Sequence, residues 1–168
     1  PILIPPLTPG VQDFTTSVNG GPALLWVDTP NLYIDGGSGS DDVTLRTRAP
    51  NDAAWNVDVY VAGGTPSSPG NGDRLLIETP RTTPADDDVY YTPSGSDGGT
   101  LLIDDGGVAG TYDAASDTRI TIGQFIPACL PSYTSSAGGF ETLSYDGEAN
   151  ARDLLTVVTP AGADTVVL

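Results

Sequence analysis

Glycine and aspartate follow one another in one short segment, in an order that suits a calcium-binding turn. The segment reads Gly-Gly-x-Gly-x-Asp-x-Val from residue 36 to residue 43. Glycine adopts backbone angles that are closed to other residues, so the carbonyl oxygens of Gly36, Gly37 and Gly39 can face an ion. Asp41 adds carboxylate oxygen, the hard ligand that Ca²⁺ prefers. The segment therefore predicts a calcium site, after which Val43 begins the apolar side of a strand.

Further acidic residues could complete the coordination shell of that ion. Asp35 and Asp42 lie close enough in sequence to bring the number of oxygens to six or more. Asp146 and Asp153 belong to a later corner with fewer glycines, and the three aspartates at residues 86–88 repel one another unless a cation lies among them. Each of these segments has the alternative interpretation of a solvated turn, in which Asp hydrogen-bonds its own backbone.

The nine residues 36–44 resemble the calcium-binding repeat of the haemolysin-type (RTX) family and of related repetitive bacterial surface proteins. The resemblance covers one repeat unit of the 168-residue chain. It implies a parallel β-roll whose successive turns share calcium ions, with calcium as the cofactor. It also implies a location outside the cell or at the cell surface.

The residue types that most catalytic sites need are missing from this chain. It has no His, and its six basic residues are all Arg. A Ser-His-Asp triad, a Cys-His pair, a Schiff-base lysine and a histidine-ligated zinc are therefore excluded. A glycosidase-like carboxylate pair remains conceivable at the acidic clusters of residues 86–88 and 104–105, but such clusters are typical of turns. We predict that the chain is not an enzyme.

The net charge of −16 limits the partners that the surface can attract. Nucleic acid and anionic membranes are disfavoured, whereas divalent cations are natural partners. The alternative is that the acidic residues keep an extracellular protein soluble. No run of residues approaches the ~18 apolar positions of a membrane span.

The composition also predicts the elements that must position the glycine corner. The chain contains 21 Gly and 15 Pro, which interrupt it too often for long helices. We therefore expect an all-β fold of many short strands. A parallel β-solenoid or β-roll-like stack is the main prediction, and a β-sandwich is the alternative.

A loose internal repeat supports the stacked arrangement. Each unit has a strand with alternating apolar residues, a corner with Gly or Asp, an irregular loop, and an Asp that begins a second apolar strand. Further corners are expected near Gly95 and Gly123. The units align residues 32–37 and 42–45 with residues 59–64 and 73–77, and with residues 143–148 and 153–157.

The two ends of the chain predict a route to self-assembly. Residues 1–9 form an apolar, proline-rich extended arm, and residues 10–168 form a single β-rich repeat domain. A strand that ends without a polar cap leaves N–H and C=O groups that can recruit an arm from a neighbouring copy. The residues expected in this head-to-tail contact are Ile2, Leu3, Ile4, Leu7, Val166, Val167 and Leu168.

Taken together, these features predict an extracellular structural protein, a calcium-stabilised β-rich building block of a fibre, surface layer or adhesin. The alternative is a carbohydrate-binding or carbohydrate-cleaving module on a β-helix scaffold, with a polysaccharide as its ligand. Tyr33 and Tyr60 bear on this choice, because each points away from the apolar residue that follows it. They could form an exposed aromatic platform for sugar rings, or take part in ordinary packing.

Overall fold

A computed structural model of the chain defines the fold. It describes residues 12–46, 57–64, 72–78, 88–94, 98–104, 108–113, 117–124, 130, 132–133, 142–146 and 154–157. Within these ranges the chain forms eleven β-strands and no helix, which confirms the all-β class for this part of the chain. Among the same residues there is accordingly no helix long and apolar enough to cross a membrane. The arm at residues 1–9 and the end at residues 166–168 lie outside the described ranges.

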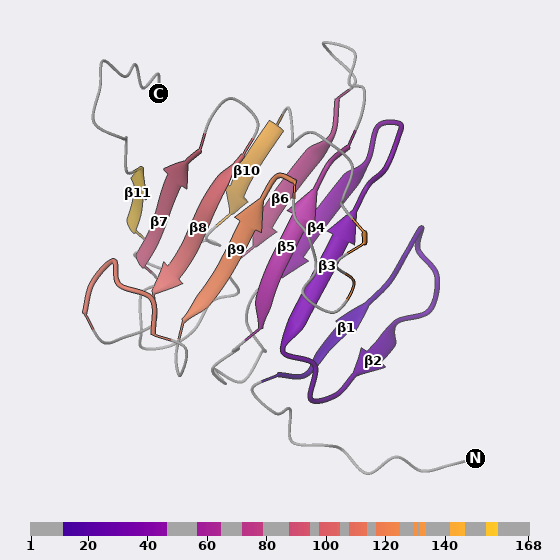
Figure 1. Ribbon diagram of the computed structural model, residues 1–168, viewed down its shortest axis with the longest axis horizontal. Helices are drawn as coiled ribbons and strands as arrows, with labels where there is room; N and C mark the ends of the chain where they lie inside the picture. The colour runs from indigo at the N-terminus through magenta and orange to yellow at the C-terminus, as the bar shows by residue number, and fades with distance from the viewer. Residues whose placement is uncertain are drawn as a thin grey trace.

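The larger sheet contains parallel and antiparallel neighbours. Its strands lie in the order β11 (Leu154–Val157), β7 (Asp88–Pro93), β8 (Gly99–Asp104), β9 (Thr118–Ile122), β5 (Asp58–Ala62) and β3 (Asn31–Asp35). The three strands β3, β5 and β9 run parallel, whereas β8 is antiparallel to both β7 and β9. At the far edge, β11 pairs with β7 in parallel. Figure 1 shows these strands side by side.

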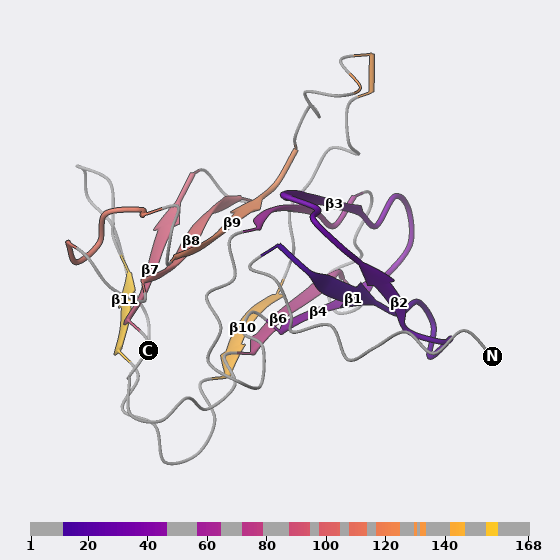
Figure 2. The same ribbon diagram turned by 90° about the horizontal axis from the view of Figure 1, so that it is seen from below.

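A second sheet lies against the first, and a hairpin stands beside both. The second sheet has the order β10 (Thr142–Asp146), β6 (Arg74–Glu78) and β4 (Asp42–Arg46), all parallel. The hairpin pairs β1 (Phe14–Thr16) with β2 (Leu24–Trp26). Figure 2 shows the two sheets as separate layers, with the hairpin at the end where β3 and β4 lie.

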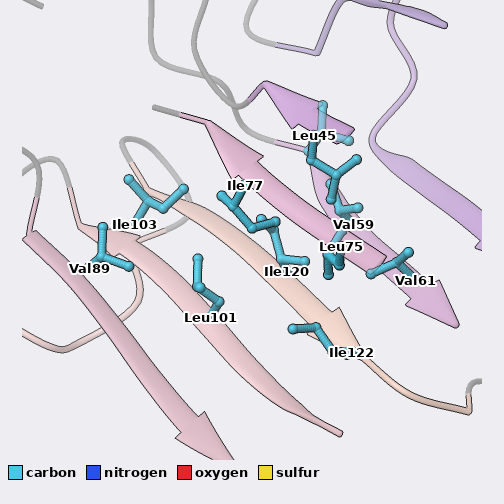
Figure 3. Packing of buried hydrophobic residues seen from close by; sticks show 11 residues of the cluster. Leu45, Val59, Val61, Leu75, Ile77, Val89, Leu101, Ile103, Ile120 and Ile122 are labelled. Atoms are coloured by element: carbon cyan, nitrogen blue, oxygen red, sulfur yellow. The ribbon is translucent and has the colours of Figure 1, made fainter. Parts of the chain in front are cut away.

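The core fills the space between the two sheets. In β5, Val59 and Val61 are buried while Asp58 and Tyr60, which alternate with them, are only half-buried, because successive side chains of a strand point to opposite faces. The same alternation in β6 buries Leu75 and Ile77. Figure 3 shows side chains from both sheets pointing toward one another. The buried cluster comprises Leu45, Val57, Val59, Val61, Leu75, Ile77, Val89, Leu101, Ile103, Ile120 and Ile122.

The larger sheet is mixed, whereas a solenoid or β-roll stack would make it parallel throughout. The difference arises between β7 and β8, where the backbone N–H of Ser94 donates to Gly98 O at 2.9 Å. A loop this short joins antiparallel neighbours, because a parallel pair needs a crossover of a dozen or more residues. The corner expected near Gly95 falls in sequence between Ser94 and Gly98, and residue 95 itself is outside the described ranges.

The register corrects one unit of the predicted repeat. Leu32 in β3 lies opposite Val59 in β5, as the repeat alignment predicts. The next strand of this ladder is β9, which leads to the predicted corner at Gly123. Leu143 in β10 instead lies opposite Leu75 in β6. Its alignment with β3 and β5 is wrong, because similar apolar alternation occurs in strands of both sheets.

Candidate metal centre

Two glycine corners stack closely at the ends of β3 and β5. The backbone N–H of Gly36 donates to Ala62 O at 2.9 Å and continues the ladder into the corner. A Cβ atom on Gly36 would lie 2.2 Å from Gly63 O, and a Cβ on Gly64 would lie 2.0 Å from Gly37 O. Contacts this short leave no room for a side chain. Glycine therefore allows the two backbones to lie against each other.

The carboxylate of Asp41 is directed at this glycine corner. A Cβ on Gly36 would lie 3.0 Å from Asp41 Oδ2, and a Cβ on Gly39 would lie 4.0 Å from the same atom. Asp41 Oδ2 is buried and has no hydrogen-bond partner among the described residues. A buried carboxylate oxygen without a partner is unfavourable, since it has lost water and gained nothing in exchange. A cation is the natural counterpart for such an atom.

Asp73 is a second acidic residue beside Asp41. Its Oδ1 accepts a hydrogen bond of 2.8 Å from the backbone N–H of Asp41, and Asp73 is only 1% exposed. The backbone N–H of Arg74 donates to Asp41 O at 2.8 Å, so the two acids precede neighbouring strands of one ladder. The repeat alignment instead matches Asp73 with Asp42, whereas in the structure Asp42 lies opposite Arg74, one residue further along the chain. The signal that could have identified the match is the equal spacing of Asp41 from the buried Leu45 and of Asp73 from the buried Ile77.

Asp42 points away from the corner. Its side chain is 78% exposed, and its Oδ1 lies 3.7 Å from Arg74 Nε across the ladder. Successive residues on a strand alternate between faces, which separates Asp42 from the carboxylate of Asp41. An exposed ion pair of this kind contributes little to stability.

Asp35 bonds to the corner itself and to a distant tyrosine. Its Oδ1 accepts a hydrogen bond of 3.1 Å from the backbone N–H of Gly37, and its Oδ2 accepts one from the hydroxyl of Tyr133. This hydrogen bond is the largest influence on the Tyr133 hydroxyl, and it raises the pKa of Tyr133 above its ordinary value. Asp35 therefore braces the glycine corner and connects it to residue 133.

The later candidates lie elsewhere. Asp146 is at the end of β10, opposite Glu78, four positions beyond the start of the strand. At about 3.3 Å per residue, that places its backbone roughly 13 Å along the strands from Arg74, and further still from Asp73. Asp153 is outside the described residues. In the part of the chain that the structure describes, no three His, Cys, Asp or Glu side chains gather as a metal-binding group.

The acidic residues considered for catalysis have structural contacts. Asp88 and Asp104 lie opposite each other in the hairpin of β7 and β8. Asp104 Oδ2 accepts a hydrogen bond of 2.7 Å from the backbone N–H of Gly110. This bond holds the segment of residues 108–113 against the end of β8. Residues 86, 87 and 105 are outside the described ranges.

The face of the larger sheet opposite the core carries aromatic residues. Tyr33 and Tyr60 lie in register on β3 and β5, and their rings stack with centroids 4.7 Å apart and planes 12° apart. Both side chains are half-buried. Tyr60 is followed across the sheet by Thr121, so the row becomes polar beyond the two rings.

Comparison of the chain with models of protein families, with curated proteins and with solved structures found no match. Function is therefore interpreted from the chemistry of the described residues.

Proposed function

We propose that the chain is an extracellular structural protein, a calcium-stabilised building block of a fibre, surface layer or adhesin. In this proposal each coil of a β-roll-like stack takes one strand from each parallel ladder: β3 with β4, β5 with β6, and β9 with β10. The antiparallel strands β7 and β8 are inserted between the second and third coils along the chain. The observation that carries the proposal is the buried Asp41 Oδ2 over the glycine corner, which has no hydrogen-bond partner among the described residues.

The residues at this corner fit a calcium ion. Asp41 would hold the ion through its carboxylate, together with carbonyl oxygens of Gly36, Gly37 and Gly39. Asp73, buried and hydrogen-bonded to the backbone of Asp41, adds a second negative charge nearby. When bound, calcium would supply positive charge between the first two coils. Removal of the ion would leave the buried Oδ2 of Asp41 close to the buried Asp73, which destabilises the folded chain.

A comparison of two aspartate variants tests the calcium site. Saturating calcium at 100 times Kd adds about 2.7 kcal/mol to the free energy of unfolding, which is a rise in Tm of about 5–10 °C for a chain of this size. We expect this rise for the wild type and for the control Asp42→Asn, whose residue is exposed. Asp41→Asn should lose most of the rise and, in EDTA, melt no lower than the wild type. Equal calcium responses in all three proteins, or none in the wild type, would refute the site.

Carbohydrate binding is the second candidate function. It is favoured by the position of Tyr33 and Tyr60 on the side of the sheet away from the core. Aromatic rings on a sheet surface can stack against sugar rings. Retention on insoluble polysaccharides should then fall in Tyr33→Ala and remain unchanged in Asp42→Asn. Absence of retention by the wild type would leave the structural role alone.

A further inference from the structure

The hairpin of β1 and β2 exposes large apolar side chains that nothing in the described chain covers. Leu24, Leu25, Trp26 and Val27 are 58%, 50%, 46% and 44% exposed, and Val18 in the turn is 75% exposed. The exposed residues include both faces of β2, because Leu24 and Leu25 are adjacent in one strand. Contiguous apolar surface on a soluble protein marks an interaction site.

Among the described residues, the hairpin contacts the buried core through β1. Phe14 in β1 packs against the buried cluster, and its ring stacks on that of Trp26 with centroids 6.4 Å apart. The indole N–H of Trp26 also donates to Thr16 Oγ1 at 2.9 Å. In both views β2 is the outer strand of the pair (Figures 1 and 2), and within the described residues it pairs with no strand other than β1.

A two-stranded ribbon is marginally stable in water, and three or more strands with an apolar face are needed for independent stability. We propose that the third and fourth strands come from a second copy of this chain, whose β2 pairs antiparallel with β2 around a twofold axis at Leu25. Leu24 of each copy then lies opposite Trp26 of the other, and Leu25 lies opposite its own counterpart. The contact is isologous, since the same surface is used on both copies.

The exposed apolar area of the hairpin and its lack of charge are consistent with a second copy of the chain as its partner. Five large side chains at about half exposure offer on the order of 500 Å² per copy, if each exposes roughly 200 Å² when free. The two copies together would bury at most about 1,000 Å², the lower limit for a specific interface, so the dimer should be weak. Residues 14–27 carry no charged side chain, so two chains of net charge −16 can meet here without opposing carboxylates.

The inference deepens the proposed function, because it names one surface through which building blocks meet. It rests on the proposal that the chain associates with copies of itself, but it does not require calcium or the arm of residues 1–9. The two proposals therefore fail separately: the calcium experiment can succeed with a monomer, and the dimer can form in EDTA.

Disulfide trapping tests the register of the proposed pair. In a Cys129→Ala background, which removes the single cysteine, Leu25→Cys places two thiols opposite each other with Cα atoms about 4.5–5.5 Å apart, within the range of a disulfide. Val27→Cys is the matched control, because its two copies would be separated by about 13 Å along the strands. We expect covalent dimer from Leu25→Cys to form at least about tenfold faster. Equal rates, or monomer alone, would overturn the proposal.

A charge variant tests the association without a covalent bond. Leu25→Lys places like charges opposite each other at the axis and should raise the Kd of the dimer about tenfold or more in sedimentation experiments. Val108→Lys makes the same change of charge at a 71% exposed residue outside the hairpin and should leave the Kd unchanged. A dimer that persists in Leu25→Lys contradicts the proposal. The proposal is also contradicted if the wild type is monomeric and Leu25→Lys has a lower Tm than the wild type. That result would mean that the hairpin is covered by its own chain.

Discussion

At the scale of single residues, the adjacent Gly36 and Gly37 are glycine for different physical reasons. Gly37 has a φ of 83°, in the left-handed region, and a Cβ atom there would meet nothing within 4 Å. Gly36 has no such φ, but a Cβ atom there would collide with the backbone of Gly63. The requirement at residue 37 is therefore conformational, and that at residue 36 is steric.

This difference predicts unequal effects of alanine at neighbouring positions. Gly37→Ala should lower the free energy of unfolding by about 1–2 kcal/mol, the cost of a left-handed backbone for a residue with a Cβ. Gly36→Ala should lower it by about 3 kcal/mol or more, because the opposing atom is a backbone carbonyl that cannot rotate away. Urea unfolding of both variants measures the difference. A smaller loss for Gly36→Ala would mean that the two corners do not stack as described.

At the scale of elements, a loop folds back over the outer face of the larger sheet. Arg119 in β9 donates from Nη2 and Nε to Asp58 Oδ1 in β5, at 2.9 and 3.1 Å. Its guanidinium carbon lies 4.2 Å from the centre of the Tyr112 ring, which belongs to the loop of residues 108–113. The ring thus fastens the loop to two neighbouring strands of the parallel ladder.

The loop contact predicts a loss of stability at alkaline pH. Burial, and then the nearby charge of Asp58, raises the pKa of Tyr112 above its ordinary value of 10.0, although Arg119 opposes the shift. A raised pKa in the folded state gives stability that is complete below pH 10 and is lost as the pH rises through the higher value. The free energy of unfolding should therefore fall more steeply above pH 10 in the wild type than in Tyr112→Phe. Parallel curves would show that Tyr112 ionises equally well in the folded and unfolded chain.

At the scale of the whole molecule, the edge strands of the two sheets are exposed to further pairing. β3 and β11 are the edges of the larger sheet, and β4 and β10 are the edges of the smaller one. Edge strands present unpaired N–H and C=O groups that can accept a further strand. A net charge of −16 works against the approach of other copies, and salt screens that repulsion.

Deletion of residues 1–9 tests the head-to-tail assembly predicted from the ends of the chain. The shortened chain should assemble less, because the apolar side chains of Ile2, Leu3, Ile4 and Leu7 no longer bury against a neighbour. Light scattering and electron microscopy at several salt concentrations measure the change. Unchanged filaments would show that the arm is not the linker, and the same experiment with Leu25→Lys separates the arm from the hairpin.

The amino-acid sequence by itself determined the class of fold. Frequent Gly and Pro exclude long helices, and the alternation in segments such as residues 58–61 specifies which face of a strand is buried. These are local properties that need no knowledge of the partner strand. The position of the glycine corner after residue 35 was predictable for the same reason, as was the pairing of Leu32 with Val59.

Only the tertiary structure decided which strands are neighbours. Apolar alternation is the same in either sheet, so it could not show that Leu143 belongs with Leu75 or that β8 runs antiparallel. A shift of one residue moves a side chain to the other face of a strand. That shift makes Asp41 the partner of the buried Asp73 and leaves Asp42 in solvent, a distinction between two adjacent aspartates that depends on the register of the assembled sheet.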